Sequence, residues 1–71
     1  MSFWVRAEMT FHVHKLKRGW CVRRGGSSRA LSIHDQKADA VAEGRGVARR
    51  ARGSLIIHNK AGLVTARHSY E

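Results

Sequence analysis

A chain of 71 residues can form one domain with a thin core, and it leaves no room for a separate catalytic domain. Its 14 Lys and Arg residues against 5 Asp and Glu residues give a formal charge of +9, which makes acidic partners the first to consider. The single cysteine, Cys21, excludes an intramolecular disulfide and suits a reducing compartment. No apolar run approaches the roughly 18 residues that span a bilayer, and no signal peptide pattern is present. We therefore expect a soluble, cytoplasmic protein that does not bind membranes.

Residues 1–8 precede the first regular pattern of the chain. They include Phe3 and Trp4, but they contain no turn signal and no alternation that fits the segments that follow. We expect an N-terminal extension here, either disordered or used to contact another chain, and a single small domain over residues 9–71.

Three strands are expected in the first half of the chain. Residues 10–16 alternate apolar and polar side chains, and residues 20–24 do so again after a short basic turn, which predicts a hairpin. Residues 25–28 have the composition of a flexible turn. A third strand is then expected over residues 29–34, with its apolar side chains facing the core: Leu31 and Ile33.

Residues 35–53 are expected to form the only helix. Asp35 is predicted as its N-cap and Gly53 as its C-terminal stop. Small residues recur along about a third of the helix surface, which would let the axis lie close to a sheet: Ala40, Val41, Gly44, Val47, Ala48 and Ala51. The glycine in the middle of this stripe predicts that a bulky residue of the sheet presses against it.

Residues 54–58 are the most β-prone segment, with Leu55 and Ile57 as its expected core face. A turn follows, and a short fifth strand is an option over residues 63–65. The predicted fold is α+β, a small, mostly antiparallel sheet of four or five strands with one helix packed on one face. Its predicted order is β-β-β-α-β, with an optional final strand.

Over about residues 10–70, several segments together resemble the domain-of-unknown-function family 2188, which comprises small bacterial and phage proteins. The similarity includes Gly19-Trp20-Cys21-Val22-Arg23-Arg24, Leu55-Ile56-Ile57-His58 and Ser69-Tyr70. The chain departs from the family just before the Gly-Trp pair. Other members often have a proline there, or a glycine and an acidic residue, whereas this chain has Lys15, Leu16, Lys17 and Arg18. The family usually begins where Met9 stands, which agrees with an added segment at residues 1–8. The resemblance implies a fold, and no biochemical activity can be carried over from it.

The basic residues form two regions of the sequence. One comprises Lys15, Lys17, Arg18, Arg23, Arg24 and Arg29, and the other comprises Arg45, Arg49, Arg50 and Arg52. A phosphate backbone favours such surfaces through counterion release, which predicts salt-sensitive, sequence-independent binding of nucleic acid. Two structural explanations compete with this one. Arginines in the last turn of a helix complement its macrodipole, and a run of charges often forms only a solvated surface.

His12 and His14 are two residues apart on one strand and therefore share a face, with Cys21 or Arg23 expected opposite them. A His-x-His pair plus a cysteine can begin a zinc site, but no second tight pair completes a tetrad. Uncharged surface histidines explain the same residues equally well. The sequence therefore assigns no metal and no cofactor, and it leaves a metal at His12, His14 and Cys21 open.

An enzyme is not expected. Cys21 beside Trp20 is typical of a packed hairpin residue, with Trp20 in the core, and five acidic residues offer no paired carboxylates. No glycine-rich phosphate loop precedes a helix. Two hypotheses remain, and both are binding functions. The first is a small nucleic-acid-binding protein, and the second is an interaction module whose sheet edge or outer face docks on another protein or on a second copy of the chain.

Overall fold

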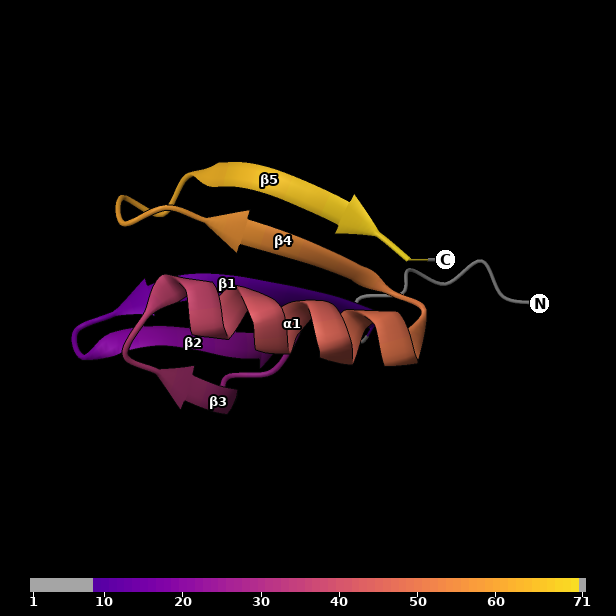
Figure 1. The fold of residues 1–71 in the computed structure, drawn as a ribbon, viewed down its shortest axis with the longest axis horizontal. Coiled ribbons are helices and arrows are strands. Elements are labelled where there is room, and N and C mark those ends of the chain that lie inside the picture. Colours follow the sequence, from indigo (N-terminus) through magenta and orange to yellow (C-terminus); the bar gives the residue numbers. More distant parts are fainter. Residues whose placement is uncertain (1–8, 71) are drawn as a thin grey trace.

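The computed structural model describes residues 9–70, so the expectation for residues 1–8 lies outside the described residues. These residues form, in order, β1 (Thr10–Leu16), β2 (Gly19–Arg24), β3 (Ala30–His34), α1 (Lys37–Ala51), β4 (Ser54–His58) and β5 (Val64–Ser69) (Figure 1). The predicted α+β class and order of elements are confirmed, including the fifth strand. No helix within residues 9–70 has the length and apolar character that crossing a lipid bilayer requires.

The strands form one mixed sheet in the order β3-β2-β1-β4-β5. Pairing is antiparallel throughout except between the central strands β1 and β4, which are parallel. The helix explains this exception. It returns the chain to the end of the sheet where β3 began, so β4 runs in the same direction as β3. Because β1 and β3 are both antiparallel to β2, β1 and β4 are parallel.

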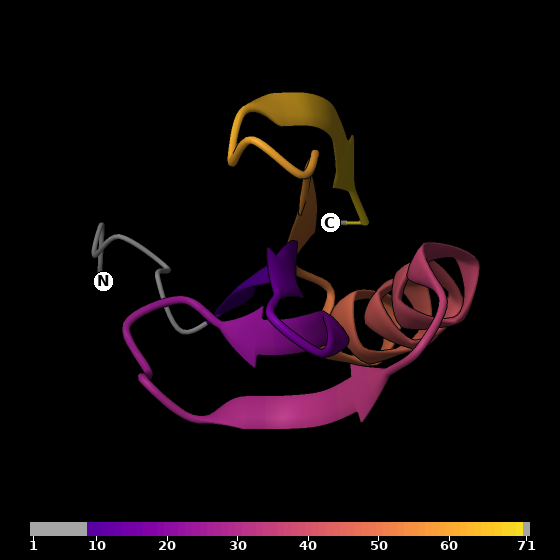
Figure 2. The same cartoon turned by 90° about the vertical axis from the view of Figure 1, so that its left-hand side faces the viewer.

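The core lies between α1 and one face of the sheet, and Figure 2 shows the helix on that side only. The helix contributes its predicted small stripe, in which Ala40, Gly44 and Ala48 are buried. The sheet contributes larger side chains: Phe11, Val13, Trp20, Val22, Leu55 and Ile57. The predictions for the stripe, for Trp20 and for the core face of residues 54–58 are therefore confirmed.

Gly44 is the point of closest approach between helix and sheet. A Cβ atom at this position would lie 2.8 Å from Leu55 Cδ1 and 3.1 Å from Val13 Cγ2. Both neighbours are fully buried, so they have little space into which to move. The absence of a side chain at Gly44 therefore sets the distance between α1 and the centre of the sheet, as the sequence predicted.

Both predicted helix caps are wrong. Gln36 occupies the N-cap, with extended backbone and no capping hydrogen bond from its side chain, because two residues are needed to turn the chain from β3 into α1. At the other end, Arg52 rather than Gly53 adopts the left-handed conformation, with φ 55° and ψ 40°. Gly53 serves a different purpose, since a side chain there would collide with the Met9 carbonyl group next to β1.

The predicted orientation of the third strand is also wrong. Leu31 and Ile33 are 50% and 60% exposed. Ile33 pairs with Cys21, whose neighbours Trp20 and Val22 point into the core, so Ile33 lies on the face opposite α1. Leu31 is skipped where the register shifts between β2 and β3. Alternation identified two sets of residues on this strand, but it did not show which set faces the helix.

The close approach at Gly44 predicts that Gly44→Ala destabilises the protein, although alanine has the higher helix propensity. We expect overpacking against Leu55 and Val13 to cost about 1–3 kcal/mol, which outweighs a propensity gain of about 1 kcal/mol. Gly46→Ala is the matched control in the same helix, because a Cβ there would meet only Arg50 Nη1, at an ordinary 3.5 Å. Urea unfolding measures both effects. A stabilised Gly44→Ala variant would contradict the packing described above.

Candidate nucleic-acid interface

The fold divides the first predicted basic region. Its residues occupy three separate places: Lys15, Lys17 and Arg18 at or near the β1–β2 turn, Arg23 on the sheet face opposite α1, and Arg24 and Arg29 at the other end of the sheet. Arg23 and Arg24 lie on opposite faces because successive residues of a strand alternate. These six residues are close in the sequence, but the β1–β2 hairpin places them in separate parts of the fold.

Part of the first region lies at the same end of the sheet as the second region. Ser54, which begins β4 just after the helix, pairs with Thr10 at the start of β1. Arg24 at the end of β2 pairs with Phe11, also at the start of β1, so both segments reach the same end of the sheet (Figure 1). We call this region the arginine end: Arg24, Arg29, Arg45, Arg49, Arg50 and Arg52.

All six residues of the arginine end are exposed. The acidic residues of the described chain lie elsewhere, between the end of β3 and the middle of α1: Asp35, Asp39 and Glu43. Within residues 9–70, no ion pair joins a guanidinium group of the arginine end to a carboxylate. Arg49 instead lies over the ring of Tyr70, 5.6 Å from its centroid. The positive potential of this end is therefore not neutralised by the described part of the chain.

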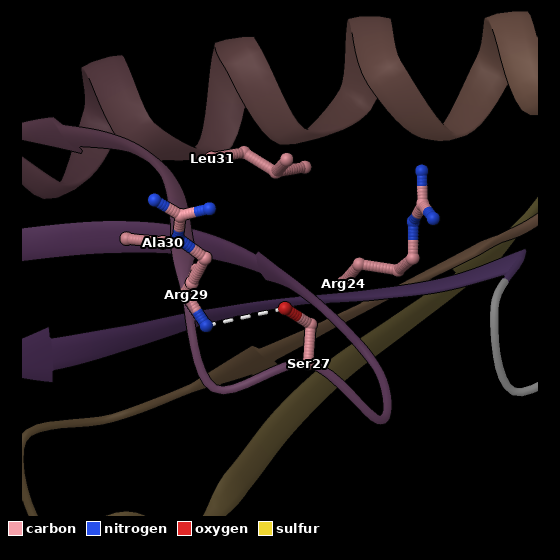
Figure 3. Close-up of a pocket in the computed structure, with 5 residues that line it drawn as sticks. All are labelled: Arg24, Ser27, Arg29, Ala30 and Leu31. Atoms are coloured by element: carbon pink, nitrogen blue, oxygen red, sulfur yellow. Dashed lines mark hydrogen bonds between the residues drawn. The ribbon is translucent and has the colours of Figure 1, made fainter.

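An open pocket of about 370 Å³ lies at the arginine end. It is lined by Arg24, Ser27, Arg29, Ala30 and Leu31, and Figure 3 shows the two guanidinium groups on either side of Leu31. Ser27 Oγ accepts a hydrogen bond from the backbone N–H of Arg29 at 3.1 Å. A serine hydroxyl also donates, so the pocket is lined by two cations and one neutral donor, groups that can bind phosphate oxygens. Sequence reasoning missed Ser27, because only the folded β2–β3 loop brings it to the two arginines.

Arg52 holds a conformation that normally favours glycine. Its N–H donates to the Arg49 carbonyl at 3.1 Å and the N–H of Gly53 donates to the Ala48 carbonyl at 2.9 Å, which together form a Schellman motif. A non-glycine residue at positive φ costs about 1 kcal/mol. Strain of this kind is often found at functional sites.

The predicted His12, His14 and Cys21 do share the sheet face opposite α1, and His58 of β4 joins them. Cys21 Sγ and Arg23 Nε lie 3.1 and 3.3 Å from the same nitrogen, His14 Nε2. Within residues 9–70, no group of three or more His, Cys, Asp or Glu side chains is arranged to hold a metal ion. The sequence did not reveal His58 as a neighbour, because that contact requires the non-local pairing of β1 with β4.

Burial is the main influence on the titration of these groups. It lowers the pKa of His12, and the charges of His58, Arg23 and His14 lower this pKa further. Burial likewise lowers the pKa of His14, with a further contribution from Arg23. Burial raises the pKa of the Cys21 thiol, against the opposing effects of Arg23 and His14. At about pH 7 the two imidazoles of β1 are therefore neutral and the thiol is protonated.

The model of a family described as "Uncharacterized protein conserved in bacteria (DUF2188)" matches residues 11–70. The chain belongs to this family. No curated protein and no solved structure matches it. The resemblance found in the sequence is thus confirmed, and the matched range of this DUF2188 protein includes all five strands and the helix apart from Thr10 of β1. The family description carries no activity, so the function has to be inferred from the side chains.

The strained conformation of Arg52 predicts that Arg52→Gly raises the stability of this DUF2188 protein by about 1 kcal/mol. Arg52→Ala is the control, because it removes the same charge and keeps a Cβ atom at positive φ. Thermal unfolding of the three proteins at equal ionic strength measures the difference. Equal stabilisation by glycine and alanine would show that charge repulsion, and not backbone conformation, is relieved at this position.

Proposed function

We propose that this protein is a small, non-enzymatic, cytoplasmic protein that binds the phosphates of nucleic acid without regard to sequence. One observation carries the proposal, namely that six exposed arginines belong to segments at the same end of the sheet while the described acidic residues lie outside this end. Cations clustered in this way attract a polyanion far more strongly than the same charges spread evenly over a surface.

The helix sets a spacing that suits several phosphates. Arg45, Arg49 and Arg52 follow one another at intervals of four and three residues, so they project from one side of α1 and its C-terminal cap. With a rise of about 1.5 Å per residue, this row covers about 10 Å. Double-stranded DNA carries one charge per about 1.7 Å of its axis, so each guanidinium group finds a phosphate within reach.

The pocket of Arg24 and Arg29 offers a second group of cations on the β3 side of the domain, whereas Arg49 of the row lies against Tyr70, which follows β5 at the opposite edge of the sheet. Guanidinium groups form paired hydrogen bonds with phosphate oxygens, and the hydroxyl of Ser27 adds a third donor. Contacts of this kind position a backbone but distinguish no bases. The arginine end is thus equipped for binding that depends on charge and salt and not on sequence.

Binding to duplex and single-stranded oligonucleotides should therefore weaken steeply with salt, by about a hundredfold or more between about 50 and about 200 mM. The double variant Arg45→Glu/Arg50→Glu should lower the affinity and reduce the slope of log affinity against log salt by about 2. This variant leaves the contact of Arg49 with Tyr70 in place. Fluorescence anisotropy measures the affinities, and circular dichroism verifies that the fold is unchanged.

Lys17→Glu/Arg18→Glu is the matched control for this experiment. It makes the same change in net charge at the β1–β2 turn, which lies at the other end of the sheet. We expect it to reduce the salt slope by less than half as much, because Asp35 already lies beside this turn, near Gly19. Equal losses from both variants would mean that net charge alone drives binding and would contradict a localised interface.

A second candidate function, docking on a protein or on a second copy of the chain, is supported by apolar residues at the two sheet edges. Leu31 and Ile33 on β3, and Leu63 and Val64 at β5, are at least 50% exposed. Edge strands with exposed apolar side chains are common sites of strand addition. In a pull-down with this chain, retention of one partner protein at both salt concentrations would favour this function over the first, provided that no nucleic acid binds.

A further inference from the structure

The face of the sheet opposite α1 carries a second set of functional side chains. No helix within residues 9–70 covers this face (Figure 2). Strand alternation and register place on it the residues that we call the histidine face: His12, His14, Cys21, Arg23, Ile56, His58 and Arg67. Its three histidines are half-buried at its centre, and Arg67 is exposed.

The imidazole rings form a compact aromatic cluster. The rings of His12 and His58 are stacked, with centroids 5.3 Å apart, and the ring of His14 meets His58 edge-on at 6.3 Å. His58 Nδ1 donates to the Gly62 carbonyl at 3.2 Å, so its Nε2 accepts from His12 Nδ1 at 3.1 Å. These contacts hold the aromatic rings together on this face of the sheet.

Cations flank this cluster on both sides. The pairings Arg67 with Ile56, Ile56 with His12, and His12 with Arg23 form one row across four strands. At about 4.8 Å per strand, the row is about 14 Å long, with a guanidinium group at each end. The acidic residues of the described chain lie in α1 and the segment before it, so this face carries none within residues 9–70.

The chemistry of this face argues against a cation as its ligand. Arg23 Nε donates to His14 Nε2, the nitrogen that a metal would need, and the side chain is held in place by a further bond to the Ser27 carbonyl. Aromatic rings between two guanidinium groups instead match a ligand in which flat rings alternate with negative charges. Unpaired nucleotides have this composition, whereas the bases of a duplex are stacked on one another and cannot lie on a protein surface.

The β2–β3 loop connects this face to the arginine end. Arg23 binds the Ser27 carbonyl group from the histidine face, while the Ser27 hydroxyl group lies in the pocket with Arg24 and Arg29. Arg23 and Arg24 are thus adjacent in β2, with Arg23 on the histidine face and Arg24 on the other face of the sheet. A strand whose phosphates occupy the pocket can pass around this loop onto the histidine face.

We propose that the histidine face stacks the bases of single-stranded nucleic acid whose phosphates are bound at the arginine end. The inference rests on the proposed function and adds a substrate class to it. Binding at the arginine end alone depends on phosphates, so it treats any backbone alike. If bases stack on His12 and His58, they contribute to the binding affinity, and a single strand becomes the preferred ligand.

The test compares three probes of about twelve nucleotides, a length typical of single-strand binding sites, at one salt concentration and with the full chain. These are a single-stranded DNA, an abasic strand with the same number of phosphates, and a duplex. We expect the single strand to bind the wild-type protein about fivefold or more tightly than the abasic strand. His12→Ala should bring this ratio close to one without changing the affinity for the abasic strand.

Two variants serve as controls. His12→Phe restores a flat ring and should keep the preference for the single strand, which also guards against a variant that merely loosens the sheet. His68→Ala removes an imidazole that pairs with Leu55 and therefore lies on the other face of β5, so the preference should be unchanged.

Equal affinity of the wild-type protein for the single strand and the abasic strand would overturn stacking and leave phosphate binding intact. A ratio that is unchanged in His12→Ala would overturn the histidine face as the site. Absence of binding to all three probes would overturn the proposed function itself, and this inference with it.

Discussion

The close contact between α1 and the centre of the sheet at Gly44 is the constraint on which the rest of the structure depends. A core built from so few residues must bury its large side chains efficiently, and they come from the sheet: Phe11, Val13, Trp20, Val22, Leu55 and Ile57. The helix contributes small residues and thereby lies close enough to cover these side chains. Because this one helix covers only one face, the other face of the sheet is left without a covering element within residues 9–70.

The same crossing of the sheet determines where the charges gather. The helix starts beside the β1–β2 turn and ends beside the start of β1, so its arginine-rich half lies toward the end of the sheet that carries Arg24 and Arg29, and its acidic half lies toward the other end. The arginines in its last turn also complement the helix macrodipole. That stabilisation and a binding function are compatible, since a side chain that lies near the carbonyl ends of a helix can still contact a phosphate. Stability alone does not explain the arginine at position 52, because its left-handed backbone conformation costs less for glycine.

Much of the fold could be predicted from the sequence, because its signals are local. The alternation in residues 10–16 and 54–58 and the small stripe of the helix each involve neighbours in the chain. The errors arose where the answer depends on distant segments. The orientation of Ile33 follows from its register with Cys21, and the glycine at position 53 is explained by the approach of Met9. Asp35 has the chemistry of an N-cap, but it lies one residue too early in the turn between β3 and α1.

The candidate site shows the same division between local and non-local information. Clusters such as Arg49 and Arg50 are visible in the sequence, but their place at the same end of the sheet as Arg24 and Arg29 follows only from the β2–β3–α1 arrangement. Likewise, the His12 and His14 pair is local, whereas His58 joins it only through the parallel pairing of β1 with β4.

The fold places the arginine end apart from the acidic residues of the described chain, and NMR mapping of the isotope-labelled full chain with a single-stranded oligonucleotide tests the proposed binding at this end most directly. Amide signals should shift at the arginine end and along β1, β2 and β4 on the histidine face. Signals from the first turn of α1 and from the β1–β2 turn should stay in place. The largest shifts in that first turn and that hairpin turn, or small shifts spread evenly over the domain, would contradict the proposed binding.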